Sequence, residues 1–353
     1  MTFTEFIKNI IKNLFSHSLS QKRLPPPPSL PKKKEESDDV WVLSIDGGGI
    51  RGLISAYVLE ALSESLNKKN GNNDIADYFD LVAGTSTGGL IALCLTKKDP
   101  LSISEITSMY LHKNEIFFPH PKSFFERLLK EKYSINEMEN FFKSIFKDDT
   151  FSSLKNNTLI MSYDINSSLP LPLSKETTPN ILLKDASRAT TAAPTFYPPL
   201  NLKINDKEYS LIDGGVVANN PVIWAYAKAK ALYPKRKNIH ILSIGNFRKK
   251  PTFNADSGSF SWIDITKGNL PIQTLYHSAS NSNSDALAKM LPDLDYIRIE
   301  YKNDKEEGIK MDDNSPLTIN RLTMMGKNLV ETNKGTIDNI ADKLICHKKA
   351  KFN

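Results

Sequence analysis

Apolar and polar positions follow two different spacings along the chain from residue 40 onward. Continuous apolar runs with the character of buried strands occur at Val40–Ile45, 79–84, 157–165 and 238–246. Between them, apolar residues at helical spacing predict one helix over Leu53–Asn67 and another over Gly88–Thr96. Strands that alternate with helices predict an α/β fold with three layers (α/β/α), in which helices cover both faces of a mainly parallel sheet.

The first 39 residues show a different pattern. Residues 1–19 carry an apolar stripe that includes three phenylalanines, with Lys8 and Lys12 on the other side, which predicts an amphipathic helix. Such a helix fits a membrane interface, and it equally fits docking on its own protein or on a partner chain. Residues 20–39 contain four consecutive prolines and a run of charges, which predicts a linker. We therefore expect a globular domain over residues 40–345 and a short tail over 346–353.

Residues from about 102 to 150 interrupt the alternation of strands and helices. Segments such as "FFERLL" and "MENFFKSIF" have the apolar spacing of helices. We expect a helical insertion here that forms a cap over a site.

Composition places the chain among ordinary globular proteins, with 40% hydrophobic and 24% charged residues. The net charge of +6 fits an anionic surface such as phospholipid, although scattered lysines usually only interact with solvent. There is no run of about eighteen apolar residues, and lysines and asparagines interrupt the apolar core that a signal peptide needs. We expect a cytoplasmic protein that associates peripherally with membranes. Secretion by a signal-independent route would leave the same sequence pattern.

Metal and cofactor chemistry has little support in the sequence. The chain has six histidines and two cysteines, Cys94 and Cys346, without a CxxC or HExxH pattern. We expect neither a metal nor a cofactor. Two distant cysteines also give no disulfide framework, which suits a reducing compartment.

The pattern G-x-S-x-G occurs at Gly84-Thr85-Ser86-Thr87-Gly88, between an apolar strand and an apolar helix. A serine at the tip of such a turn projects its hydroxyl, and the flanking glycines remove Cβ clashes. The helix N-terminus directs N–H groups toward developing negative charge. Ser86 is therefore a candidate nucleophile. The alternative is a glycine turn that binds an anion such as phosphate.

A second glycine-rich turn, "DGGGIRG", follows the first strand. Gly47, Gly49 and Gly52 spell G-x-G-x-x-G, the outline of a dinucleotide-binding turn. Such a fold needs an acidic residue at the end of a second strand about twenty positions on, and that region is polar and turn-like here. The glycines also offer N–H groups that can converge on an oxyanion. Arg51 adds a cation that can meet a phosphate or steady the loop, and Asp46 is expected to brace the turn.

Asp213 lies in a third stretch, "SLIDGGVVANNP". An Asp-Gly pair between apolar residues is by itself a signal for a β-hairpin. As a partner for Ser86, Asp213 would need direct contact with it and a desolvated pocket, because an ordinary carboxylate is a weak base. A histidine base is the alternative, since Ser86, Asp213 and either His240 or His277 follow the chain order of an α/β-hydrolase triad.

Four segments together resemble the patatin-like phospholipase family, from about Val40 to Gly245. They are "DGGGIRG", "GTSTGG", "SRATTAAPTFYPP" (187–199) and "DGGVVANNP" (213–221), in the family's order and spacing. The resemblance implies a Ser86–Asp213 dyad, with Gly47, Gly48 and Gly49 as oxyanion-hole donors and Arg51 nearby. The motif glycines are Gly52, Gly84, Gly88, Gly214 and Gly215. Thr87 N–H, next after the nucleophile, is expected as a further donor.

The resemblance also implies calcium-independent hydrolysis of fatty-acyl esters in membrane phospholipids. The expected partners are thus the phospholipid substrate and a membrane surface, with no nucleic acid; the linker and tail also permit an activating ligand or protein. A non-catalytic module that binds a nucleotide or phosphate stays open as a different class of function.

Overall fold

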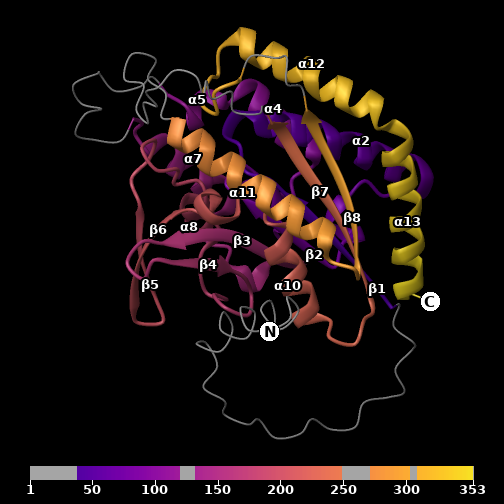
Figure 1. Cartoon of the computed structure of the whole chain (residues 1–353). Coiled ribbons are helices and arrows are strands. Elements are labelled where there is room, and N and C mark those ends of the chain that lie inside the picture. The colour runs from indigo at the N-terminus through magenta and orange to yellow at the C-terminus, as the bar shows by residue number, and fades with distance from the viewer. Residues whose placement is uncertain (1–37, 120–131, 249–270, 303–307, 353) are drawn as a thin grey trace, which may run out of the picture. The chain divides into compact units, whose positions relative to one another are not determined.

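The computed structural model describes residues 38–119, 132–248, 271–302 and 308–352 (Figure 1). The predicted N-terminal helix and all of the linker up to residue 37 lie outside the described residues. So does the part of the predicted cap at 120–131. Residues 38–353 form one compact unit, and the fold below is that of this unit.

An eight-stranded mixed sheet forms the middle of the unit, with strand order β5-β6-β3-β2-β1-β7-β8 and β4 paired to β3. The pairs β3–β2, β2–β1, β1–β7 and β7–β8 are parallel, whereas β4, β5 and β6 join by antiparallel pairing. The strands are β1 Asp39–Ile45, β2 Leu81–Thr85, β3 Asn157–Asp164, β4 Leu169–Leu173, β5 Leu200–Ile204, β6 Lys207–Asp213, β7 Asn238–Arg248 and β8 Leu294–Lys302.

Helices cover both faces of this sheet, which confirms the predicted α/β/α architecture (Figure 1). On β1, Val40 and Val42 pack toward α9–α11, while Trp41 and Leu43 belong to the larger core on the opposite face. Because both faces are buried, the strand reads as a continuous apolar run. The α-helices are α2 Gly52–Asn70, α3 Thr87–Thr96, α4 Ile103–His112, α5 Asn114–Phe117, α7 Asn136–Phe146, α8 Leu183–Thr190, α9 Gly215–Ala218, α10 Val222–Leu232, α11 Pro271–Met290, α12 Pro316–Thr332 and α13 Lys334–Phe352.

Strand β3 brings two other strand ends together. It pairs with β2 up to Met161, which lies opposite Thr85, and with β6 from Ser162, which lies opposite Asp213. Strand β4 occupies one edge of β3 across this point, since Met161 and Ser162 also pair with β4. A strand has only two edges, so β2 and β6 share the other and meet end to end. The residues that follow Thr85 and end β6 are thereby neighbours.

One boundary differs from the sequence prediction, and one alternative interpretation, a hairpin at Asp213-Gly214, is excluded. Helix α13 continues past residue 345, where we expected the domain to end, to Phe352. His347 in this last part is buried, and its Nε2 lies 2.8 Å from Asp80 Oδ2, which fixes the helix to the body of the unit. Asp213-Gly214 does not form a hairpin turn, because β6 leads directly into α9.

Within the described ranges, no helix combines the length and the apolar character that crossing a bilayer requires.

Candidate active site

Ser86 occupies a sharp turn between β2 and α3. Its backbone has φ 54° and ψ −125°, an uncommon conformation for a residue other than glycine. Two glycines make the turn feasible, because a Cβ at Gly84 would collide with the Gly88 backbone and one at Gly88 with the Ile45 carbonyl. The predicted G-x-S-x-G turn between strand and helix is therefore present, and the serine stands at its tip.

Asp213 lies beside Ser86 at the end of β6. Its side chain is 3% exposed, and its Oδ1 accepts a hydrogen bond from Gly215 N at 2.7 Å. Burial raises the pKa of Asp213 to about 7, and the Ser86 hydroxyl and the Gly215 amide, which favour the charged form, offset only part of the rise. The structure thus brings Ser86 into contact with a carboxylate that is a stronger base than an ordinary aspartate.

The glycine loop after β1 faces the same turn. Gly47 N–H donates to the Asn219 carbonyl at 2.9 Å, so that Gly47 does not offer its amide to an oxyanion, and this part of the prediction is corrected. Gly49 has φ +60°, and a Cβ there would collide with the Met311 carbonyl. Gly48 and Gly49 line the pocket that holds Ser86, as does Thr87. The amides of these three are the remaining candidates for oxyanion donors.

Arg51 supports the glycine loop. Its Nε donates to Gly48 O at 3.1 Å, and its Nη1 approaches Phe247 O at 3.5 Å. Burial lowers the pKa of Arg51 to about 10, against the opposing charge of Asp46, and the side chain still carries a positive charge at neutral pH. Of the two roles expected for Arg51, loop support has a direct geometric basis.

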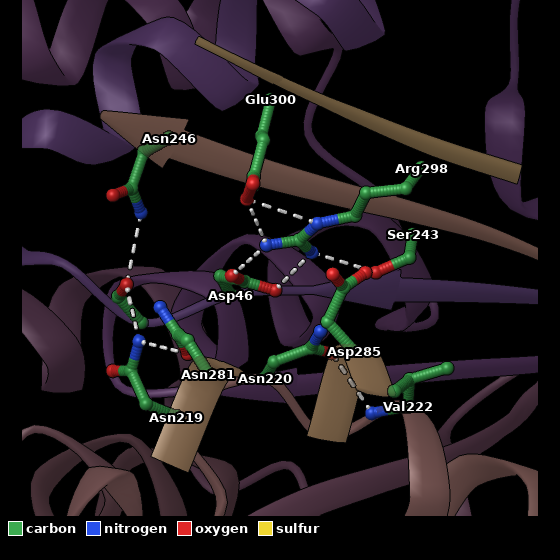
Figure 2. A network of polar contacts seen from close by, with 12 residues as sticks. Asp46, Asn219, Asn220, Val222, Ser243, Asn246, Asn281, Asp285, Arg298 and Glu300 are labelled. Atoms are coloured by element: carbon green, nitrogen blue, oxygen red, sulfur yellow. Dashed lines mark hydrogen bonds and ion pairs between the residues drawn. The ribbon is translucent and has the colours of Figure 1, made fainter. Parts of the chain in front are cut away.

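Asp46, which begins the loop, is held by a buried ion pair (Figure 2). Arg298 on β8 donates to both carboxylate oxygens of Asp46, at 2.7 and 2.6 Å, and also to Ser243 Oγ and Glu300. Burial disfavours the charge on Arg298, but the two carboxylates outweigh it and raise its pKa well above the usual value. The expected brace at Asp46 is present, and Arg298 is the partner that no sequence motif indicated.

Two asparagine amides, those of Asn246 and Asn219 (Figure 2), converge on the Gly47 carbonyl. Asn246 donates to it at 2.8 Å and Asn219 at 3.2 Å, while Asn219 also donates to Asn281 of α11. Asn246 sits at an irregularity in the β7–β8 ladder, and such bulges redirect side chains. The orientation of the peptide between Gly47 and Gly48 is therefore fixed from its carbonyl side.

The pocket around Ser86 is lined mostly by apolar side chains. The described cap helices α4, α5 and α7 contribute Tyr110, Phe117 and Met138, as expected of a cap. Tyr110 also contacts the Thr87 hydroxyl. The other large apolar lining residues are Ile50, Leu90, Phe118, Phe196, Tyr197 and Met311. Such walls suit an acyl chain better than a nucleotide.

The two histidine candidates have different positions. His240 pairs in register with Trp41, four residues before the Ile244–Ile45 pair at the loop end, a distance of roughly 13 Å. It stacks on Trp41, and its Nδ1 lies 2.8 Å from Asp295 Oδ2. The structure therefore does not bring His240 to Ser86. His277 lies in α11, but its side chain lies outside the described residues.

No group of three or more His, Cys, Asp or Glu side chains converges as metal ligands in the part of the chain that the structure describes.

Comparison with known proteins gives consistent matches. A family model described as patatin-like phospholipase matches residues 43–226. Patatin-like protein 2 of Arabidopsis thaliana is 35% identical over 307 residues, which cover 74% of this chain and 75% of that protein. Patatin-like protein 2 of Oryza sativa subsp. indica is 30% identical over 347 residues, 85% of each chain. Among solved structures, VipD from Legionella pneumophila aligns with 90% of this chain and 73% of its own, with a TM-score of 0.41 and 12% identity.

Proposed function

The chain belongs to the patatin-like phospholipase family, whose members are serine hydrolases of ester bonds, and we propose that it releases fatty acid from membrane phospholipids through a Ser86–Asp213 dyad. One observation carries the proposal. Ser86 and the buried carboxylate of Asp213, whose pKa is about 7, line the same apolar pocket, and the Ser86 hydroxyl favours the charged form of that carboxylate. A carboxylate with that pKa is ionised in a large fraction of molecules at neutral pH and still basic enough to take a proton.

In the first step, Ser86 Oγ attacks the ester carbonyl while Asp213 takes its proton. The negative charge that develops on the carbonyl oxygen is held by the amides of Gly48, Gly49 and Thr87, and each such donor contributes roughly 3 kcal/mol in comparable sites. The bond to the glycerol oxygen then breaks, Asp213 returns the proton to that oxygen, and the lysolipid leaves.

In the second step, water attacks the acyl-serine. Asp213 takes the water proton, the same amides hold the second oxyanion, and the proton returns to Ser86 as the fatty acid leaves. Because N–H groups supply the charge stabilisation in both steps, we propose that the reaction does not need calcium. Hydrolysis should then continue unchanged in excess EGTA, and a loss of activity that calcium restores would contradict this.

The test is fatty-acid release from diacylphospholipid vesicles. Ser86→Ala and Asp213→Ala should each lower the rate by roughly a thousandfold or more with folding retained, since the two groups act as a unit. Undiminished fatty-acid release by either variant would contradict the proposed dyad. Comparison of defined diacyl- and lysophospholipids in the same assay identifies the preferred ester.

A triad with a histidine base predicts a different result for substitution of the histidine. His277→Ala would then be inactive, whereas the dyad requires it to retain activity. His240→Ala serves as the matched control, because His240 stacks on Trp41 away from the loop.

A serine-reactive fluorophosphonate probe distinguishes the proposed enzyme from a non-catalytic module that binds phosphate. Labelling that disappears in Ser86→Ala supports the enzyme. Absence of labelling together with nucleotide binding supports the module.

We also propose that residues 1–19 dock the enzyme on membranes, from the amphipathic pattern of that segment. Vesicle co-sedimentation of the full chain against a chain that begins near Val40 tests this. Equal binding of the two chains to vesicles would contradict a docking role for residues 1–19. A rise in hydrolysis on addition of a cellular extract would indicate an activating ligand or partner.

A further inference from the structure

The residues at the end of α8 contact the main chain of both proposed dyad residues. Ser86 N donates to Thr190 Oγ1 at 2.8 Å, and Asp213 N donates to the Ala192 carbonyl at 3.0 Å. Ser86 follows β2 and Asp213 ends β6, and the two are 127 positions apart by residue number. A single turn of chain therefore connects them through two hydrogen bonds.

The Thr190 hydroxyl is oriented so that it can only accept from Ser86. It donates its own hydrogen to the Met161 carbonyl at 2.6 Å, which leaves a lone pair for the Ser86 amide. Met161 is the β3 residue at which the pairing with β2 ends. Thr190 is fully buried, and it lies so near Gly89 that a Cβ there would approach its Cγ2 to 3.0 Å. These contacts fix the hydroxyl rigidly.

The amide N–H that donates to the Thr190 hydroxyl belongs to Ser86, whose backbone conformation is unfavourable. With φ 54° and ψ −125°, Ser86 stays in this conformation only if surrounding contacts hold it there. Ser86 precedes the first residue of α3, so its N–H is not part of the helical ladder. The bond to Thr190 fixes the peptide plane from which the Ser86 side chain projects.

We propose that Thr190 is a positioning residue for the hydrolysis: its hydroxyl holds the Ser86 main chain so that Ser86 Oγ points at Asp213. This inference rests on the proposed function. Its mutational signature follows from the Ser86 hydroxyl, which holds the pKa of Asp213 below the value that burial alone would give. If the serine is displaced, that pKa rises and the pH profile of the reaction moves upward.

The experiment compares Thr190→Val, which keeps the shape and removes the hydroxyl, with Thr190→Ser, which keeps the hydroxyl. We expect Thr190→Val to lower kcat by about 10- to 100-fold with KM nearly unchanged, because misplacement of a reacting group by about 1 Å has effects of this size. Its kcat/KM profile should shift to higher pH. Thr190→Ser should restore both the rate and the profile.

Thr158→Val is the matched control. Thr158 is also buried, on β3, and its hydroxyl donates to Thr96 Oγ1 at 3.0 Å, away from the dyad. Thr158→Val should keep the wild-type pH profile. The proposal is overturned if Thr190→Val behaves like Thr158→Val, or if Thr190→Ser is as impaired as Thr190→Val.

Two further measurements keep the test decisive. If Thr190→Val fails to fold, Thr190→Cys, a weaker acceptor, should lose part of the rate with the same upward shift, and a wild-type profile would overturn the proposal. Hydrogen exchange of the Ser86 amide needs no activity: it should be faster in Thr190→Val and slow in Thr190→Ser. If the Ser86 amide exchanges at the same rate in Thr190→Val and Thr190→Ser, Thr190 has no positioning role. The proposed hydrolysis is tested separately, because its failure would appear as absent activity in the wild type.

Discussion

At the scale of the residue, the distinctive feature is the environment of Asp213. Its carboxylate is buried, and the Ser86 hydroxyl and the Gly215 amide do not cancel the cost of placing a charge there. The same burial has two consequences, one for activity and one for stability.

The activity should depend on one ionisation near neutrality. Asp213 must be deprotonated to accept the Ser86 proton, and its pKa is about 7. We expect kcat/KM to reach half its maximum near pH 7 and to fall about tenfold per unit at lower pH. A profile that is flat from pH 5 to 9 would exclude Asp213 as the base. Initial rates across this range with a soluble acyl ester provide the measurement.

Stability should change in the opposite direction. The pKa of Asp213 is higher in the folded protein than in the unfolded chain. The contribution of this buried carboxyl to the free energy of unfolding is therefore fully present below the unfolded pKa and is lost as pH rises through about 7. Asp213→Asn cannot ionise, and it should therefore be more stable than the wild type at pH 8, by up to about 4 kcal/mol, with little difference near pH 4. Urea unfolding at the two pH values measures this, and a gap independent of pH would refute it.

At the scale of the element, the glycine loop depends on close approach of main chain to main chain. Ile50 N donates to Met311 O at 2.8 Å, and Gly49 packs against that same carbonyl. A side chain on Gly49 would therefore push the loop away from residue 311.

Gly49→Ala and Gly71→Ala separate this collision from backbone strain. Both glycines have positive φ, +60° and +67°, but a Cβ at Gly71 meets nothing within 4 Å. Gly71→Ala should cost about 1 kcal/mol of stability and leave hydrolysis intact. Gly49→Ala should in addition lower kcat by roughly a hundredfold through displaced oxyanion amides. Equal kcat in the two variants would contradict the role given to the loop.

At the scale of the whole molecule, three of the residues that support the loop come from beyond the region that the family model matches, although Asn219 lies within it. That region ends at residue 226, whereas Asn246, Arg298 and Met311 follow it along the chain. The second half of the sheet and the segment before α12 are therefore part of the site's architecture, although the motifs lie mostly in the first half.

The buried pair of Asp46 and Arg298 tests this dependence. Arg298→Gln should destabilise the fold by about 3–5 kcal/mol, because it removes the cation that pairs with the buried carboxylate of Asp46. Adding Asp46→Asn should recover part of that loss. Lys302→Gln is the control, since Lys302 is half-exposed and also contacts Glu300 at 3.1 Å; it should cost at most about 1 kcal/mol. Strict additivity of the two core substitutions in urea unfolding would show that the pair does not couple.

The sequence predicts the parts of this protein that depend on local patterns. The layered fold, the turn at Ser86 and the contact of Asp213 follow from periodicity, glycine spacing and family resemblance. Asn246 and Arg298 could not be predicted, because no motif marks them and their partners are 199 and 252 positions away. Thr190 lies in one of the four segments of the resemblance, but nothing in the pattern connects its hydroxyl with Ser86, 104 positions away. The end-to-end meeting of β2 and β6 could not be predicted either, since it depends on how two strands share an edge of β3.

The proposed oxyanion donors are main-chain groups, and this changes what a mutational survey of the protein would find. Replacement of each residue in turn by alanine removes side-chain atoms at all positions except alanine, where nothing changes, and glycine, where it adds a methyl group. At Gly48 the added methyl would collide with the Asn246 amide, and at Gly49 with Met311 O. A survey would therefore record the two positions as sites intolerant of bulk, although the groups proposed to hold the oxyanion, the amide N–H bonds, are present in every variant.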